Sequence, residues 1–537
     1  MTTPGSLLGI PKFSQWYPGQ EALCNQIAEW LQGPERFLGA ALPTGYGKSL
    51  IGMLAARNSR MRTVFLTSTK ALQTQLMEDF QPAGLVDIRG KNEYTCNRWP
   101  TLQADEAPCN DGYACPDQFT PRCSYYKQLA VTRQSRLVVT NYACWMAQQN
   151  YTRDGLNLVL RNERGVVQSI PNETSFLICD EAHLAGRALE SFMSFYFTPR
   201  DRESIPWEED WGYDDWVRAC TPILRRIPDQ VAAIQSRIDR NEPGSDVSKE
   251  LSRSKRRLSA LERKLHTLVK DCRDWICEYQ GTGKDAKCVW TPVWPGRYNH
   301  YLFGDVPKVL LMSAMFTKPM MERLGAEGPW IDSPSPFPVR HTPVMHVNTA
   351  RIDHRADDED MEKWVDRIDE IIGSRGKRKG IIFTVSYARA RFLAEHSRYS
   401  DLMMQHTTRN VAQVVAGFKR ADAPRILVSP SVTTGYDFPG DECRYIIVAK
   451  VPYPDTRGAV IKARQAEDKS WTSQLAMETL VQEAGRGTRS AEDRCQVFIV
   501  DDTWLWWWPR NKHLAPRWFT ERVTPRSYDR IPIPFTD

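Results

Sequence analysis

Short apolar runs, separated by amphipathic stretches, recur in two segments of the chain. In the first segment, up to about residue 190, the runs are RFLGAAL, TVFLTST, RLVVTNY and SFLICDE. In the second segment they are GIIFTVS, RILVSPS, RYIIVAK and CQVFIVDD. Short apolar runs with helical patterns between them predict strands that are buried on both faces of a parallel sheet. We therefore expect an α/β protein with two similar domains and a cleft between them.

A charged, helical stretch at residues 218–278 interrupts the first segment, and the strand-like run KVLLMSAMF follows it. Leucines recur in it at helical spacing, which predicts an apolar stripe on one helix face. They are Leu251, Leu258, Leu261, Leu265 and Leu268. Lys249–Lys270 carries eight Lys or Arg and only two Glu. This pattern favours the solvated face of an antiparallel helical hairpin, and a basic surface along a phosphate backbone is the alternative.

Charge and hydropathy limit the classes of partner. The 537 residues include 71 Lys and Arg and 65 Asp and Glu, a net charge of +6, so local patches would have to hold a nucleic acid. No run of 18 apolar residues is present, which argues against a membrane partner. The start, MTTPGSLLGIPKF, lacks the pattern of a secretory leader. We expect a cytoplasmic protein, from a bacterium or a phage-infected host, rather than a secreted one.

Four of the thirteen cysteines cluster within 28 residues. They are Cys96, Cys109, Cys115 and Cys123. The total of thirteen is odd and fits a fully paired disulfide framework poorly. The four clustered cysteines include no Cys-x-x-Cys pair, so structural zinc is the weaker interpretation of them. Four thiolates on an irregular loop suit an iron–sulfur cluster, whose irons bind cysteine sulfur. A set of unrelated thiols is the remaining alternative.

A glycine-containing loop, in LPTGYGKSLIGMLAA, follows the first strand-like run. Gly45 and Gly47 allow backbone N–H groups to face a phosphate. Lys48 would contact the β and γ phosphates of a nucleotide and Ser49 would bind Mg²⁺, at the positive end of the next helix. Leu42 stands where the strict pattern has Gly, so a chance glycine-rich turn is the alternative.

Two carboxylates, Asp180 and Glu181 in FLICDEAH, follow a predicted buried strand. They would lie at the carboxyl edge of the sheet, where α/β proteins bind ligands. Asp180 would hold Mg²⁺ and Glu181 would polarise an attacking water. The alternative is that both carboxylates cap the next helix.

The second segment adds two arginines and a third carboxylate. Arg486 and Arg489, in QEAGRGTRS, are three residues apart and so lie on one side of a helical turn. Both guanidiniums could neutralise charge on a shared phosphate during its transfer, and an ordinary surface ion pair is the alternative. Asp437, in TTGYDFPG, is a candidate contact for a ribose or for coupling.

The order of these motifs resembles that of the XPD/DinG group of iron–sulfur superfamily-two DNA helicases, over nearly the whole chain. TGYGKS resembles motif I, TSTKALQTQL resembles motif Ia, DEAH is motif II and QEAGRGTR resembles motif VI. RGKNEYTC resembles the lead-in to the first cluster ligand, and CSYYKQLAVTRQSRLVVTNYACW the segment after the fourth. LLMSAMF stands at motif III with Met315 in place of Thr, and SPSPF matches a Ser-Pro-Phe signature. TTGYDFPG and KVPYP resemble motif V and the signature that trails it.

This resemblance implies two RecA-like motor domains, residues 1–325 and 326–537. The first would carry a cluster insert at about residues 92–125, in which the four cysteines hold a [4Fe–4S] cluster. It would also carry a helical Arch-like insert at about residues 192–298.

The resemblance also implies a role for each motif residue. The residues that would bind ATP and Mg²⁺ are Thr44, Gly45, Gly47, Lys48 and Ser49. Gln20 in YPGQ would read the adenine. His183 and Ser313 would link hydrolysis to movement. The second domain would close the site with Gln482, Arg486 and Arg489.

The implied function is an ATP-dependent motor that moves 5′→3′ on single-stranded DNA. It would act as a monomer and unwind duplex, forked or R-loop-type substrates, which include RNA–DNA hybrids. One alternative is a DNA translocase that removes proteins or RNA without processive unwinding. Another is a non-catalytic iron–sulfur scaffold that binds DNA, which the presence of Lys48, Glu181 and Arg489 disfavours.

Overall fold

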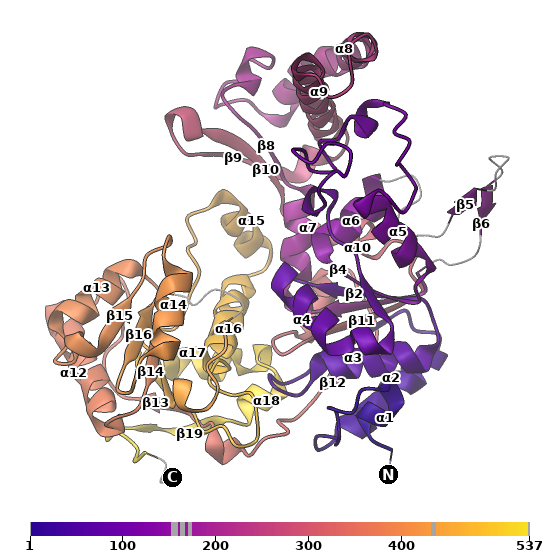
Figure 1. Ribbon diagram of the computed structural model, residues 1–537. Helices are drawn as coiled ribbons and strands as arrows, with labels where there is room; N and C mark the ends of the chain where they lie inside the picture. Colours follow the sequence, from indigo (N-terminus) through magenta and orange to yellow (C-terminus); the bar gives the residue numbers. More distant parts are fainter. Residues whose placement is uncertain (1, 152–158, 162–166, 170–173, 431–435, 535–537) are drawn as a thin grey trace.

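Two seven-stranded sheets form the body of the protein in the computed structural model (Figure 1). The structure describes residues 2–151, 159–161, 167–169, 174–430 and 436–534. Within each sheet, every paired strand runs parallel to its neighbour. The apolar runs form fully buried central strands of both sheets. The prediction of two parallel α/β domains is therefore confirmed.

In the first sheet, the strand that precedes the glycine-containing loop lies next to an edge strand. In spatial order its strands are β12 (Trp330–Asp332), β1 (Phe37–Ala41), β11 (Lys308–Ser313), β7 (Phe176–Asp180), β2 (Thr63–Thr67), β4 (Leu137–Asn141) and β3 (Leu85–Asp87). β12 lies beyond the boundary expected at residue 325, yet it pairs with β1. The change from one sheet to the other therefore falls between residues 332 and 344.

The second sheet is built only from the C-terminal part of the chain. In spatial order its strands are β15 (Met403–Gln405), β16 (Ile426–Ser429), β14 (Gly380–Phe383), β17 (Tyr445–Val448), β18 (Gln496–Ile499), β13 (Val344–Val347) and β19 (Val523–Tyr528).

Helices cover both faces of the first sheet. One face packs against α1 (Pro4–Leu8), α2 (Gln20–Gln32), α3 (Lys48–Ser59) and α4 (Lys70–Phe80). The other face packs against α5 (Ser124–Gln134), α6 (Tyr142–Tyr151), α7 (Ala185–Met193), α10 (His300–Phe303) and α11 (Lys318–Arg323). A sheet buried on both faces explains why its strands are continuous apolar runs rather than alternating ones.

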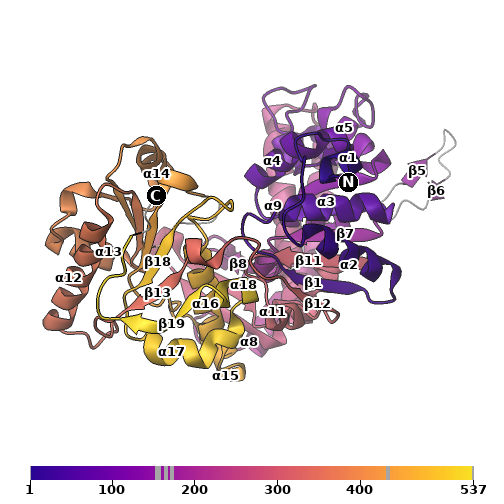
Figure 2. The same ribbon diagram turned by 90° about the horizontal axis from the view of Figure 1, so that it is seen from below.

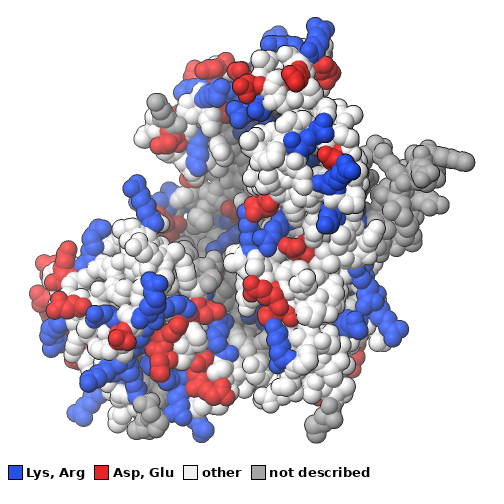
Figure 3. Space-filling model, in the orientation of Figure 1, with Lys and Arg blue, Asp and Glu red and all other residues white. Residues whose placement is uncertain are grey.

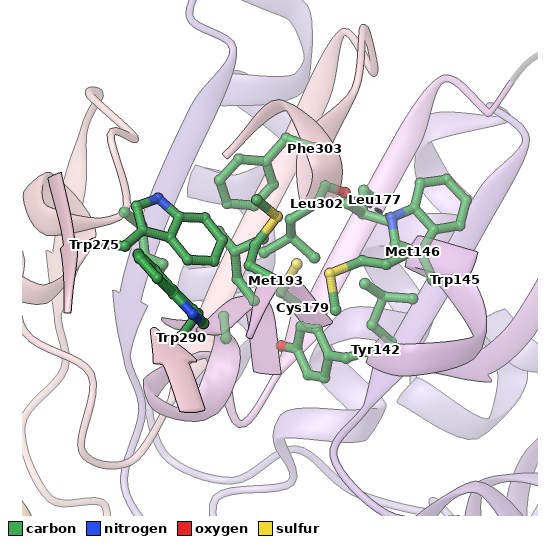
Figure 4. Close-up of a cluster of buried hydrophobic side chains, with 14 of the residues drawn as sticks. Tyr142, Trp145, Met146, Leu177, Cys179, Met193, Trp275, Trp290, Leu302 and Phe303 are labelled. Carbon is green, nitrogen blue, oxygen red and sulfur yellow. Dashed lines mark hydrogen bonds between the residues drawn. The ribbon is translucent and has the colours of Figure 1, made fainter. Parts of the chain in front are cut away.

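Figure 4 shows the core on the second of these faces. Cys179 points into it and is fully buried, as expected for a thiol among apolar neighbours. Trp145 Nε1 donates to the Leu302 carbonyl at 2.6 Å. Tyr142 Oη donates to the Asp180 carbonyl at 2.9 Å. The core therefore holds the end of β7, from which the two carboxylates project.

Helices likewise cover both faces of the second sheet. One face packs against α14 (Val411–Arg420), α16 (Trp471–Ala484), α17 (Trp504–Asn511) and α18 (Arg517–Thr520). The other packs against α12 (Asp358–Arg375) and α13 (Tyr387–His396). A further helix, α15 (Ala459–Glu467), precedes α16. Figure 2 shows the two domains side by side, with α16 and α18 between the sheets.

A helical hairpin rises from the first domain (Figure 1). It consists of α8 (Tyr213–Asp239) and α9 (Asp246–Asp271), which pack against each other. Trp216, near the start of α8, contacts a small sheet with the strand order β8 (Phe195–Phe197), β10 (Lys287–Pro292), β9 (Trp275–Gln280). Leu251, Leu261, Leu265 and Leu268 are buried and Leu258 is partly buried, so the predicted leucine stripe is correct. A separate two-stranded hairpin joins β5 (Val159–Arg161) and β6 (Val167–Ser169).

The basic residues of α9 do not form only a solvated face. The segment between β3 and α5, residues 88–123, carries the four clustered cysteines and is called the cysteine loop here. Lys255 Nζ lies 3.3 Å from Asp111 Oδ1 in this loop, and Arg256 Nη1 donates to the Asp105 carbonyl at 3.1 Å. Lys264 Nζ donates to the Tyr196 carbonyl at 2.6 Å. The simple prediction of a solvated face is therefore corrected, because three of these cations bind protein groups.

The surface agrees with the modest net charge. In the view of Figure 3, acidic and basic side chains are mixed over both domains. Across the described residues, none of the helices combines the length and apolar character that a membrane crossing requires.

Candidate functional site between the two domains

Residues 42–47 join β1 to α3, and we call them the phosphate loop. Its two glycines adopt backbone conformations that favour glycine. Gly45 and Gly47 have φ angles of 75° and 74°, in the left-handed region that only glycine adopts freely. A Cβ atom on Gly45 would lie 2.4 Å from the carbonyl oxygen of Arg489 in the second domain. Glycine is therefore required here twice, by its backbone angles and by the close approach of the other domain. Leu42, which replaces the glycine of the strict pattern, is fully buried.

Gln20 lies behind this loop and supports it. Its Nε2 donates to the Tyr46 carbonyl at 2.9 Å, and its Oε1 accepts from Tyr17 N at 3.2 Å. The side chain is fully buried, and it does not line the cavity described below. In this structure Gln20 positions the phosphate loop, and both of its polar atoms are occupied. Its expected role as an adenine reader stays a prediction.

The carboxylates at the end of β7 face the lysine of the loop. Lys48 Nζ lies 4.0 Å from Glu181 Oε1. Ser313 Oγ, at the end of β11, donates to Glu181 Oε2 at 3.0 Å and is 2.8 Å from His183 Nδ1. Glu181 has a φ of 49°, which is unusual for a residue with a side chain and is the kind of backbone strain that collects at functional sites. The network joins the lysine to the carboxylate and to both expected coupling residues.

The pKa values of the two carboxyl groups are shifted in opposite directions. Burial, and then the neighbouring Glu181 charge, raise the pKa of Asp180 to about 7, against the opposing effect of Lys48. Burial also acts to raise the pKa of Glu181, but Lys48, His183 and Ser313 together lower it below its ordinary value. Glu181 is therefore ionised at neutral pH. Asp180 is a buried carboxyl group whose burial Lys48 offsets only in part, which suits a group that binds a divalent metal ion.

The second domain contributes its arginines from the segment after α16. Arg486 Nη1 donates to the Tyr436 carbonyl at 2.8 Å, and Arg489 donates to Asp437 Oδ1. Burial lowers the pKa of both arginines, and the charge of Glu181 in the first domain opposes that shift. Arg486 Nη2 and Arg489 Nε have no hydrogen-bond partner among the described residues. Both guanidiniums therefore keep free N–H groups close to Glu181.

One cavity of about 360 Å³ brings these groups together, and we call it the phosphate-loop cavity. Its lining includes every nucleotide-site residue predicted from the sequence except Gln20. These residues are Thr44, Gly45, Gly47, Lys48, Ser49, Asp180, Glu181, His183, Asp437, Gln482, Arg486 and Arg489. Thr433–Gly435, the start of the motif V stretch, lie outside the described residues.

The cavity also contains residues to which no role was assigned from the sequence. Thr69, Leu72 and Gln75 line it from the start of α4, and Thr69 caps that helix by accepting from Leu72 N at 3.2 Å. The signal that could have found them is the segment TSTKALQTQL, which was matched to motif Ia without a contact being inferred from it.

The four cysteines of the cysteine loop line a second cavity together. Lys91 shares this lining. Burial raises the pKa of Cys109, while Lys91 acts to lower it. Among the residues that the structure describes, no three or more His, Cys, Asp and Glu side chains are gathered closely enough for a single metal ion. The sulfurs therefore surround a common space rather than one point.

Two known families match different parts of the chain. The family described as "Helicase C-terminal domain" matches residues 372–522, and the family "Type III restriction enzyme, res subunit" matches residues 13–197. No curated protein matches the chain in sequence.

Three solved structures have a similar fold. An XPD helicase superposes with a TM-score of 0.58 at 14% identity, covering 93% of this chain and 98% of that one. Xpd4 of S. tokodaii gives 0.56 at 12% identity, covering 92% and 98%. A structure described as XPD in its apo form gives 0.55 at 14% identity, covering 91% and 98%.

The helicase C-terminal match thus falls in the second domain and the restriction-enzyme subunit match in the first. The two parallel-sheet domains together share the fold of the XPD structures.

Proposed function

We propose that this protein is a DNA helicase that moves 5′→3′ on single-stranded DNA and unwinds forked or R-loop-type duplexes. The observation that carries the proposal is the phosphate-loop cavity. It unites Lys48 and Glu181 of the first domain with Arg486 and Arg489 of the second. A site assembled from both domains makes hydrolysis depend on their relative position, which is what a motor requires.

The residues of the cavity divide the work of hydrolysis. The N–H groups of the phosphate loop and Lys48 would bind the nucleotide phosphates. Ser49 and Asp180 would hold Mg²⁺, which supplies charge neutralisation when bound. Glu181 would orient the attacking water, and Arg486 and Arg489 would stabilise the charge that develops on the transferred phosphate. Asp437, beside both arginines, would position them.

Coupling to movement would run through Ser313. Its hydroxyl contacts Glu181 and His183 and also accepts from Met315 N at 3.3 Å. Through this hydroxyl, Glu181 is connected to the segment that follows β11. Loss of the phosphate charge would alter the contacts that hold the arginines near Glu181, and the domains would separate.

A test is ATP hydrolysis with and without single-stranded DNA, using poly(U) RNA to probe specificity for DNA. Lys48→Ala should abolish hydrolysis, whereas Lys12→Ala, which alters an exposed pair with Asp79, should leave it unchanged. Forks with a single 5′ or 3′ tail then give the direction of movement. Equal hydrolysis with and without DNA would contradict the proposal. Stimulation by DNA without fork unwinding would indicate a translocase that strips proteins or RNA.

We also propose that the four cysteines hold a [4Fe–4S] cluster. Their shared cavity supports this, because a cluster with one sulfur ligand at each iron needs its ligands around a core. The cluster would order the cysteine loop, which has few apolar residues of its own. Anaerobically purified protein should contain about four iron atoms per chain and absorb in the visible range. Cys109→Ser should reduce both, while Cys24→Ser, in the core of the first domain, should not. One zinc per chain would contradict the proposal.

A further inference from the structure

A third cavity, of about 290 Å³, lies between the two domains, as the phosphate-loop cavity does, and we call it the Trp471 cavity. The first domain lines it from α7 and α11, and the second domain lines it from α15 and α16. Its size is near the lower end of the range of about 300–1,000 Å³ that is typical of small-molecule sites. None of the motifs discussed above assigns it a ligand.

Flat groups dominate one wall of this cavity. The rings of Trp294 and Trp471 meet edge to face, with centroids 5.3 Å apart. The Arg464 guanidinium lies 5.8 Å from the Trp294 ring centroid and 5.3 Å from that of Trp471. The Arg323 guanidinium lies 5.1 Å from the Trp471 centroid on the same wall. Indole rings and planar guanidinium groups are the surfaces on which a flat aromatic ligand stacks.

The charged groups around the cavity neutralise one another. Arg187 Nη2 lies 3.5 Å from Glu478 Oε2. Arg464 pairs with Glu190, and Arg323 pairs with Asp468. Because Arg464 and Arg323 have carboxylate partners and Arg187 is largely exposed to solvent, the cavity offers little spare charge to an ionic ligand. It therefore favours an uncharged one.

Two buried N–H donors have no acceptor among the residues that the structure describes. Gln474 is 1% exposed, its Oε1 accepts from Arg323, and its Nε2 has no partner. Trp471 Nε1 also has none, and both residues line the cavity. A buried donor without an acceptor is unfavourable, so these groups indicate the position of a ligand acceptor.

We propose that the Trp471 cavity binds an uncharged, flat heteroaromatic ring that carries hydrogen-bond acceptors, which is the chemistry of a nucleobase. The ring stacks against the Trp471 wall and accepts from Gln474 Nε2 and Trp471 Nε1. Its source is either a free nucleoside or an unstacked base of a bound strand.

The helix α16 connects the Trp471 cavity to the catalytic groups. α16 lines the Trp471 cavity through its first turns and the phosphate-loop cavity through Val481 and Gln482. A ligand that contacts both domains favours one of their relative positions. It therefore changes the rate of ATP hydrolysis, and this last step alone rests on the proposed function.

The test is fluorescence titration of the full-length protein with 2-aminopurine riboside and, separately, with a single-stranded oligonucleotide that carries one 2-aminopurine. Saturating ATP is present, so that the phosphate-loop cavity is blocked. Stacking on tryptophan should quench the probe. Quenching of the riboside identifies a free ligand, and quenching of the oligonucleotide alone identifies a base of the strand.

Two variants place the binding site. Gln474→Glu keeps the oxygen bonded by Arg323 and removes the donor, so affinity should fall about tenfold or more. Gly186→Phe fills the cavity from α7, where the nearest heavy atom to a new Cβ would be Leu324 Cδ2 at 3.5 Å, and quenching should be lost. Thr479→Val, on α16 but outside the cavity, is the matched control and should bind as the wild type does.

Two results would overturn the proposal. One is the absence of quenching with either probe. The other is quenching that both Gln474→Glu and Gly186→Phe leave unchanged, since binding would then lie elsewhere. Glu181→Gln separates this proposal from the proposed function, because it should stop hydrolysis while ATP still blocks the phosphate-loop cavity and 2-aminopurine still binds.

Discussion

The two cavities at the domain interface share their walls but differ in chemistry. Both are lined by His183 and by residues of α16. In the phosphate-loop cavity, Lys48 and two arginines converge on Glu181, and polar atoms of both arginines lack partners. In the Trp471 cavity each arginine is paired with a carboxylate, and the lining is largely apolar.

The difference shows how one interface can serve two kinds of ligand. Guanidiniums that keep free N–H groups beside a glycine-rich loop suit a charged ligand whose charge increases during reaction. Paired charges around indole rings suit a neutral ligand that only binds. The same helix thus carries a catalytic end and a binding end. The variants below test this division, in order of decreasing effect.

Glu181→Gln should give the largest effect. It removes the group that orients the attacking water, so the rate of ATP hydrolysis should fall about 10³-fold while nucleotide binding is kept. Glu190→Gln, which alters a carboxylate of the Trp471 cavity, should change the rate little. Steady-state hydrolysis and binding of a fluorescent ATP analogue measure both. Similar losses of ATP hydrolysis in Glu181→Gln and Glu190→Gln would show that catalysis is not confined to the phosphate-loop cavity.

Glu478→Gln should alter the pH dependence of stability. Burial raises the pKa of Glu478 to about 7, although Arg187 and Arg323 oppose the rise. A folded-state pKa above the unfolded one means that stability is lost as pH rises from about 4.5 through 7. Between pH 5 and pH 8 the wild type should therefore lose about 2–3 kcal/mol of unfolding free energy through this group. The variant, which has no carboxyl group there, should not show this loss. Thermal unfolding of both proteins at pH 5 and pH 8 measures this. An equal change of stability with pH in the wild type and the variant would contradict it.

Asp437→Ala should reduce turnover about tenfold by releasing the arginines from their position. Its effect should appear in kcat rather than in KM, because the arginines act on charge that develops during transfer. Asp468→Ala, which removes the carboxylate partner of Arg323 beside the other cavity, is the comparison. A larger loss of turnover in Asp468→Ala than in Asp437→Ala would contradict the role of Asp437 in positioning the arginines.

Gly186→Phe should have the smallest effect on hydrolysis without added nucleoside, less than about threefold. It fills only the Trp471 cavity and leaves the catalytic groups in place. Its folding is checked by thermal unfolding. A complete loss of hydrolysis in a folded variant would show that the two cavities are not separate.

Much of the fold and of the catalytic site could be predicted from the sequence. Strands buried on both faces, such as Phe176–Asp180, leave a continuous apolar run. The glycine, lysine and carboxylate motifs each lie at a strand end, where parallel sheets bind ligands. Twelve of the thirteen nucleotide-site residues predicted in this way line one cavity.

The remaining features depend on contacts between segments that are distant in sequence. Lys255 reaches Asp111 across 144 residues, and no local pattern predicts that contact. The support that Gln20 gives to the phosphate loop, through Tyr46 and Tyr17, is another such contact, and its role as an adenine reader stays a prediction. The Trp471 cavity exists only where α7 and α16 meet, so neither segment reveals it alone.

The central claim is that one catalytic site is assembled from both domains, and Arg489→Ala tests it most directly. The measurement is single-turnover hydrolysis of ATP in the presence of single-stranded DNA, with Arg187→Ala of the Trp471 cavity as the control. We predict that Arg489→Ala lowers the rate at least about 10²-fold while binding ATP nearly as well as the wild type, and that Arg187→Ala hydrolyses ATP at close to the wild-type rate. An Arg489→Ala protein that hydrolyses ATP as fast as the wild type would contradict the account.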